Sequence, residues 1–221
     1  MVDRTNLYRI VPFGAYVFFM ILEDVLLKFG WEPSELRMLY AVKITVVAGM
    51  LWAMRSAYSE LRWPGGAGLR IWFSALVAGI AVFIAWINLT ADWMVMGEAV
   101  GFDPRENGEI DWFLVTVRII GAALVVPVME ELFWRSFLMR WIEHPNFLAV
   151  NPAQIGIKAL GISAVLFALA HSLWFAGLFA GMVYGLLYMR SKTLWLPILA
   201  HAVTNGILGV WIVATGNWGF W

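Results

Sequence analysis

Three short polar clusters stand out in this apolar chain because their residue types can carry out hydrolytic chemistry. The clusters are Glu130-Glu131 with Arg135, Phe167 with His171, and His201 with Asn205. Each lies within a hydrophobic stretch of membrane length, where an ionisable side chain costs roughly 2.5 to 3.5 kcal/mol and usually faces the protein interior. A carboxylate and an imidazole can take a proton from water, and an amide can donate to a developing oxyanion.

Helical spacing gives the two adjacent carboxylates different surroundings. Glu131 and Arg135 are four residues apart, so both lie on one helix face and can form an ion pair. Glu130 projects about 100° further round the same turn, which leaves it free to act as a general base. On spacing alone, a buried structural network of all three residues is an equally open alternative.

Two of the three histidines lie in apolar segments. His201 and Asn205 are four residues apart on one face, so a neutral imidazole and an amide can stabilise one oxyanion together. Phe167 and His171 are predicted to share a face in the same way, with Phe167 shielding the imidazole from lipid. The structural alternative for each histidine is a packed, hydrogen-bonded residue, and His144, beside Pro145, is expected to be solvated.

Composition sets the class of protein. Of 221 residues, 62% are hydrophobic and 14% charged, with 14 Trp and a mean hydropathy of +0.78, which indicates a polytopic membrane protein. The formal net charge is zero and no basic face appears, so no nucleic-acid partner is expected. The expected partner is the lipid bilayer. Because the chain has no Cys, a cysteine nucleophile and a thiolate zinc site are excluded.

The clusters must be positioned by membrane-spanning helices. We predict an all-α bundle of about seven helices (six to eight), forming one domain over residues 1–221. Runs of apolar residues predict spans near 10–29, 38–55, 70–91, 112–134, 155–173, 175–190 and 194–215. Pro127 removes a backbone donor and should kink the fourth span, which reads as one bent helix or two. A polar loop, 92–111, precedes that span.

Lys and Arg predict the orientation, because cytoplasmic loops collect them. Alternating seven spans from an inner N-terminus leaves Lys28, Arg37 and Arg105 outside. It brings most basic residues inside: Arg4, Arg9, Arg55, Arg62, Arg70, Arg140, Lys158, Arg190 and Lys192. We therefore expect a multi-pass protein of the cell membrane with a cytoplasmic N-terminus.

The order E-E-x-x-x-R, F-x-x-x-H, H-x-x-x-N resembles that of the CPBP family, also called the CAAX prenyl protease 2 or ABI family, which includes bacteriocin-processing proteins. All three motifs are intact, and the resemblance covers about residues 112–215. It implies an intramembrane endopeptidase in which Glu130 and His171 activate a water molecule and His201 and Asn205 stabilise the oxyanion. Glu131 and Arg135 would hold the site together.

The resemblance also implies a protein or peptide substrate in or at the membrane, lipid-modified proteins included. The size and the many Trp residues suit the CAAX-protease-related subgroup that accompanies exosortase systems. Two other classes of function remain open: a non-catalytic scaffold or immunity protein with the same fold, and a small proton-coupled transporter. The complete set of motif residues favours the enzyme.

A zinc site is the less favoured alternative to a cofactor-free mechanism. Two His and one Glu are a possible ligand set for catalytic zinc. However, no H-E-x-x-H motif is present, and Arg135 beside the carboxylates opposes a divalent cation. We therefore predict a glutamate-based, metal-free site.

Straight spans would place Glu130 and His171 at different depths. A hairpin that turns within the protein near 172–174, or a fourth helix that continues to about residue 142, would bring them together. We expect both. A small-residue stripe at Gly177, Gly181 and Gly185 predicts close packing against a neighbouring helix.

Overall fold

The computed structural model describes residues 4–65, 68–97 and 101–221, and most of them are helical. Its long helices are α1 (Arg4–Lys28), α2 (Leu39–Ala53), α3 (Leu69–Asn88), α7 (Ile157–Leu169), α8 (Trp174–Ser191) and α9 (Trp195–Thr215). One further continuous helix joins α4 (Trp112–Ile120), the π-helical η4 (Gly121–Val125), α5 (Val126–Glu131), the π-helical η5 (Leu132–Leu138) and α6 (Met139–Glu143). This confirms the predicted all-α bundle of about seven helices.

Short 3₁₀ helices and one small hairpin connect the long helices. They are η1 (Arg55–Ala57), η2 (Ser59–Leu61), η3 (Asp92–Met94), η6 (Phe147–Ala149), η7 (Pro152–Gln154), η8 (Trp218–Phe220) and the strands β1 (Arg105–Glu106) and β2 (Glu109–Ile110). The two strands pair antiparallel within the predicted polar loop 92–111. Residues 98–100 of that loop lie outside the described residues.

Four described helices are long and apolar enough to cross a membrane: α1, α3, the continuous helix Trp112–Glu143, and α9. Helices α2 and α7 are apolar but shorter than the spans predicted at 38–55 and 155–173. Several crossings of this kind make the chain a multi-pass membrane protein.

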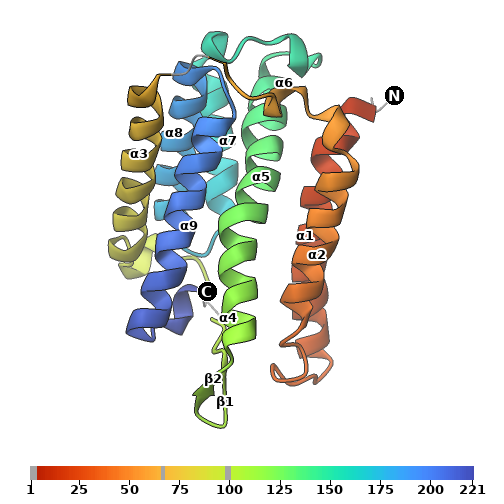
Figure 1. The fold of residues 1–221 in the computed structure, drawn as a ribbon, viewed down its shortest axis with the longest axis vertical. Coiled ribbons are helices and arrows are strands. Elements are labelled where there is room, and N and C mark those ends of the chain that lie inside the picture. The colour runs from red at the N-terminus through yellow and green to blue at the C-terminus, as the bar shows by residue number, and fades with distance from the viewer. Residues whose placement is uncertain (1–3, 66–67, 98–100) are drawn as a thin grey trace.

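The continuous helix Trp112–Glu143 occupies the centre of the bundle (Figure 1). Helices α1 and α2 form an antiparallel pair on one side of it, and α9 runs along another side, packed against α3. Helices α7 and α8 pack closely together as a hairpin. The centre of the bundle can therefore collect side chains from α5, α9 and the α7–α8 turn.

Pro127 lies inside the central helix and does not divide it. A π-helical segment, Gly121–Val125, directly precedes it, and the N–H of Val126 donates to the carbonyl of Gly121. This π-helical hydrogen bonding compensates locally for the N–H that proline lacks, so the helix is not interrupted. The helix continues to Glu143, which places Glu130 close to the midpoint of its 32 residues.

The α7–α8 hairpin reverses direction before α7 is long enough to cross a membrane, and its turn is partly exposed rather than enclosed by the protein as expected. With 13 residues, α7 rises about 20 Å and cannot cross a hydrocarbon core of about 30 Å. The turn is tied to the α3–α4 loop, since Met96 N donates to Ser172 O at 2.7 Å and Trp174 Nε1 to Trp93 O at 3.0 Å. These bonds hold the turn against the α3–α4 loop, while Leu169, Ala170 and Ser172 stay exposed at the bundle surface.

The glycine stripe of α8 lies against α7, which confirms the packing prediction. A Cβ atom at Gly181 would lie 2.9 Å from the Cα of Ala164, and one at Gly177 would lie 3.1 Å from the Cα of Ala168. Gly185 faces the side chain of Leu160 instead of the backbone of α7. Only residues without a side chain allow this approach.

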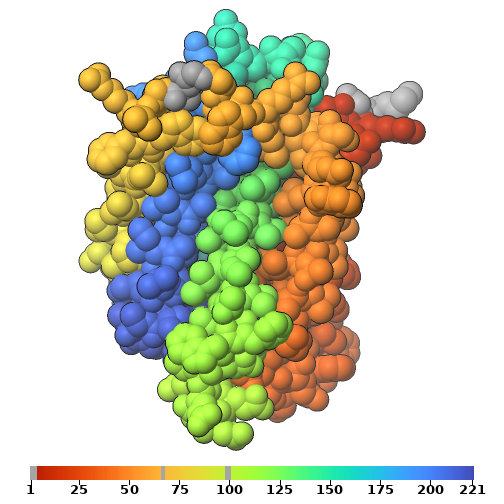
Figure 2. Space-filling model, viewed as in Figure 1, coloured from red at the N-terminus to blue at the C-terminus, as the bar shows by residue number. Residues whose placement is uncertain are grey.

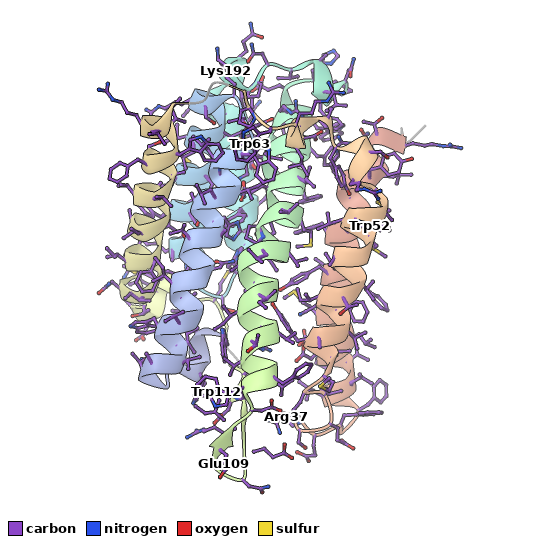
Figure 3. All side chains as sticks on the ribbon, viewed as in Figure 1. Arg37, Trp52, Trp63, Glu109, Trp112 and Lys192 are labelled. Atoms are coloured by element: carbon purple, nitrogen blue, oxygen red, sulfur yellow. The ribbon has the colours of Figure 1, made fainter. Side chains whose placement is uncertain are left out.

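The basic residues gather at the end of the bundle where α1 begins. Figure 3 shows Lys192 and Trp63 at this end and Arg37 and Trp112 near the other, with Glu109 beyond them. In the space-filling view the connection between α2 and α3 extends across the basic end (Figure 2). The separation agrees with the predicted orientation, which stays a prediction.

Candidate active site

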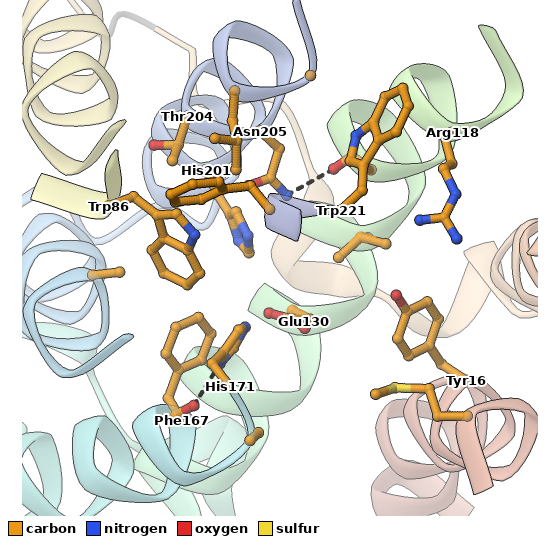
Figure 4. Close-up of a pocket in the computed structure, with 18 of the residues that line it drawn as sticks. Tyr16, Trp86, Arg118, Glu130, Phe167, His171, His201, Thr204, Asn205 and Trp221 are labelled. Carbon is orange, nitrogen blue, oxygen red and sulfur yellow. Dashed lines mark hydrogen bonds between the residues drawn. The ribbon is translucent and has the colours of Figure 1, made fainter. Parts of the chain in front are cut away.

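The three polar clusters meet in one cavity of about 460 Å³. Glu130, His171, His201 and Asn205 all line it, together with Phe167 (Figure 4). Glu130 comes from α5, His171 from the turn after α7, and the other two polar residues from α9. The fold therefore brings together residues that lie up to 75 positions apart in the sequence.

Glu131 and Arg135 form the predicted ion pair, and His201 joins it. Arg135 Nη1 lies 3.1 Å from Glu131 Oε1, and His201 Nδ1 lies 3.0 Å from the same oxygen. All three side chains are buried, and Glu131 is fully so. Burying these charges is tolerated because they are paired.

The bond to Glu131 decides what His201 presents to the cavity. A carboxylate paired with Arg135 can only accept, so Nδ1 of His201 carries the proton and donates. Neutral His201 then presents an unprotonated Nε2, and only its imidazolium form can donate from that atom. This differs from the expectation of a neutral histidine donor.

His171 is held by a backbone carbonyl. Its Nδ1 lies 2.7 Å from the oxygen of Phe167, which can only accept, so Nε2 is left as an acceptor. The expectation that Phe167 and His171 share a helix face is wrong, because α7 ends at Leu169. Their ring centroids nevertheless lie 4.6 Å apart with the ring planes tilted by 37°, so Phe167 packs against the imidazole. Its shielding of His171 from lipid stays a prediction.

Asn205 is fixed by the irregularity at Pro127. Its Nδ2 donates to the carbonyl of Ala122 at 2.8 Å. In π-helical geometry that carbonyl would accept from residue 127, which is proline and has no N–H. Pro127 thus frees an acceptor that orients the amide, whose second N–H remains available to a substrate.

Glu130 makes no hydrogen bond or ion pair with any described protein group. Its residue exposure is 7%, and its Oε2 atom is buried without a partner. The carboxylate lies within electrostatic range of His171 and Tyr16. Free of structural bonds, Glu130 is available to bind and deprotonate a ligand.

Aromatic and hydroxyl groups that spacing did not reveal complete the frame. The ring of Tyr184 stacks on His201 at 5.0 Å, and its hydroxyl donates to Thr204 Oγ1 at 2.7 Å. Thr204 is anchored in turn to the carbonyl of Gly79 at 2.8 Å. Trp86 meets His171 edge-on at 5.4 Å. Of these residues, only Thr204 could have been suspected from the sequence, because it directly precedes the motif residue Asn205.

Arg118 also lines the cavity. Among the described residues it forms no ion pair, and its guanidinium carbon lies 3.9 Å from the ring centroid of Phe102 and 4.7 Å from that of Tyr40. Lys43 lies 4.5 Å from the ring centroid of Tyr16. Both cations thus lie against aromatic faces, and Glu23 adds electrostatic attraction to each of them.

The site residues do not fit a zinc centre. Within the described part of the chain, no group of three or more His, Asp or Glu side chains is arranged to hold one metal ion. The one oxygen of Glu131 that has partners is shared by Arg135 and His201. We therefore derive no step through a metal.

Comparisons with known proteins agree with the motifs. Residues 112–207 match the family model described as "Type II CAAX prenyl endopeptidase Rce1-like". The chain is 26% identical over 219 residues to a Bacillus subtilis protein named "Putative membrane peptidase YdiL", covering 90% of this chain and 83% of the relative. A search of solved structures gave no significant match. The matched region holds every motif residue, so the similarity covers the residues that line and frame the cavity.

Proposed function

We propose that this protein is an intramembrane endopeptidase that cleaves a peptide bond with a water molecule activated by Glu130 and His171. The observation that carries the proposal is that Glu130, His171, His201 and Asn205 line one cavity. A membrane peptidase is also what the family model and the relative's name describe.

The first step is attack by water on the scissile carbonyl carbon. Glu130 has no structural partner, and Nε2 of His171 is an acceptor, so the two can share the water between them. As the oxygen attacks, one of them takes the proton. The carbonyl π electrons move onto the carbonyl oxygen, which becomes the oxyanion.

The oxyanion is stabilised by α9. Asn205 donates its second amide N–H, and protonated His201 donates from Nε2, with Glu131 balancing its positive charge. When the tetrahedral intermediate collapses, the proton held by Glu130 and His171 passes to the leaving amine. The products are a carboxylate and an amine, and no covalent enzyme intermediate forms.

We propose a substrate that is a protein or peptide in or at the cell membrane. The cavity is lined on the α1 side by apolar residues that include Phe13, Val17, Met20 and Ile21. Such a wall suits an apolar peptide segment or a lipid modification, which agrees with the prenylated substrates that the family description names.

Mapping of protein termini in the native membrane tests the proposal. Wild type is compared with Glu130→Ala and His171→Ala, and with His144→Ala as the control, because His144 is exposed outside the cavity. We expect a small set of new termini that disappears in both cavity variants and persists in the control. No dependent terminus would overturn the peptidase, and pH-driven solute flux without cleavage would instead support a transporter.

A further inference from the structure

A buried ionic network at the basic end of the bundle carries more positive than negative charge. Arg9 holds Glu60 with two bonds, from Nη2 at 2.6 Å and from Nε at 2.9 Å. Arg140 lies 3.8 Å from the same carboxylate. The side chains of Arg9, Glu60 and Arg140 are at most 7% exposed. Two buried cations therefore share a single carboxylate.

Both oxygens of Glu60 are already occupied. Oε1 accepts from Arg9 Nε and from the hydroxyl of Ser136, and Oε2 accepts from Arg9 Nη2. Burial acts to raise the pKa of Glu60, but the hydrogen bonds and charge of Arg9 and the bond from Ser136 outweigh it and hold the pKa below its usual range. Glu60 is therefore a carboxylate committed to Arg9, and it leaves Arg140 undercompensated.

A second cavity, of about 420 Å³, opens beside this network. Arg62, Arg140 and Lys192 line it, and Glu60 is the one carboxylate among its described lining residues. Arg140 is held rigidly at its wall, because Nε donates to Ser136 O at 2.6 Å and Nη2 to Ser136 Oγ at 2.7 Å. A fixed guanidinium that shares a cavity with two further cations is suited to binding an anion.

Tryptophan residues beside this cavity indicate that it lies at the level of the lipid headgroups. Trp63 follows Arg62 directly and is 69% exposed. It stacks on Trp72 at 5.1 Å and contacts Trp195 in a tilted arrangement at 5.5 Å between ring centroids. Trp195 Nε1 donates to the carbonyl of Leu61 at 3.0 Å, which ties α9 to the loop that carries Arg62. Exposed Trp residues gather at the level of lipid headgroups, and Figure 3 shows Trp63 just below Lys192.

We propose that this cavity binds the phosphate of an acidic phospholipid headgroup. Arg140 and Arg62 would bind phosphate oxygens through their guanidinium groups, and Lys192 would add a third positive charge. Tyr188 and the apolar residues Leu148, Val150 and Leu194 also contribute to the lining. A headgroup anchored here would hold the α2–α3, α6–α7 and α8–α9 connections together. Free inorganic phosphate has the same chemistry, but it lacks an acyl chain to contact the tryptophan cluster.

Lipid nanodiscs distinguish the two sources of phosphate. The purified full chain is placed in phosphatidylcholine discs with and without 30% phosphatidylglycerol, and retained lipid is counted by native mass spectrometry after transfer to detergent. A third arm adds inorganic phosphate to phosphatidylcholine discs and follows the melting temperature. We expect phosphatidylglycerol to be retained at least tenfold over phosphatidylcholine and to raise the melting temperature, and inorganic phosphate to have no effect at millimolar concentration.

Matched charge variants locate the site. Arg62→Gln/Lys192→Gln removes two cavity cations, and Lys158→Gln/Arg190→Gln removes two exposed cations at the same end that do not line the cavity. Because each cation contributes about fivefold, loss of two should abolish the preference for phosphatidylglycerol in the first variant, and the second variant should lower it by twofold or less. Equal losses in both variants would overturn a specific site. Stabilisation by inorganic phosphate equal to that by the lipid would overturn the lipid as its source.

This inference does not depend on the proposed function, because every readout is binding or stability. The charge variants leave Glu130 and the active-site cavity untouched. The proteolysis test on Glu130→Ala and the lipid-retention test on Arg62→Gln/Lys192→Gln can therefore give independent results.

Discussion

The Nδ1 atom of His201 lies 3.0 Å from Oε1 of Glu131 and joins α9 to the central helix across 70 positions of sequence. The same oxygen holds Arg135 at 3.1 Å. One buried carboxylate therefore does two tasks: it pairs with a cation on its own helix, and it fixes the ring orientation and protonated nitrogen of a histidine on another. Stability and chemistry are coupled at this atom.

Replacement of Glu131 by Gln should lower the free energy of unfolding by about 3 to 5 kcal/mol, because Arg135 is left as an uncompensated buried charge. Unfolding of the purified protein in a detergent titration measures the change. The double variant Glu131→Gln/Arg135→Gln removes both charges and should be destabilised by less than the sum of the single variants. Additive losses would contradict the coupling.

Replacement of Pro127 by Ala should lower proteolysis about tenfold while leaving the protein at least as stable. The new N–H can bond a carbonyl in the preceding turn, which removes the acceptor that orients Asn205 and costs transition-state stabilisation of about 1.4 kcal/mol. Pro12→Ala is the matched control, because Pro12 lies inside α1 and outside the cavity lining. Equal activity in both variants would exclude this role for Pro127.

Replacement of Gly181 by Ala should destabilise the protein by about 1 to 3 kcal/mol, because the new methyl group meets the Cα of Ala164 at 2.9 Å. The variant should also lower proteolysis, since the hairpin carries His171. Gly161→Ala on α7 meets nothing within 4 Å and should stabilise by about 0.5 to 1 kcal/mol. Thermal unfolding of both variants in one detergent makes the comparison, and destabilisation of equal size at both positions would argue against close packing.

The stability of the protein should fall in acid through Glu60. Because the pKa of Glu60 in the folded protein lies below its ordinary value of 4.5, its contribution is complete above that pH and is lost as the pH falls through the folded pKa. Melting temperature measured from pH 6 to pH 3 should fall in wild type. In Glu60→Gln the melting temperature should start lower and change less with pH, and parallel curves would contradict the assignment.

Much of this arrangement follows from the sequence. Hydrophobic run lengths predict α3 and α9 to within three residues at each end and the end of α1 to within one, although α1 begins six residues before its predicted span. Four-residue spacing predicts the pair Glu131 and Arg135. Both rest on local geometry, in which a residue's neighbours along the helix are fixed by the helix itself.

Other features depend on contacts between distant segments and could not be read from spacing. The end of α7 at Leu169 comes from a turn supported by the α3–α4 loop, so the motif F-x-x-x-H does not mark one helix face. The tautomer of His201 is set by Glu131, and Tyr184 enters the site only through the packing of α8 on α9. The π-helical segment before Pro127 is a local effect, but its use by Asn205 is not.

The most direct test of the central claim is the cleavage rate of Glu130→Gln, reconstituted in lipid with a substrate identified by terminus mapping. Gln keeps the size of the side chain but cannot accept the proton of water, so the rate should fall about 10²- to 10⁴-fold while the melting temperature stays that of wild type. Glu109→Gln, which changes an exposed carboxylate in the β1–β2 hairpin, should cleave at the wild-type rate. A folded Glu130→Gln protein that cleaves within threefold of wild type would contradict the account.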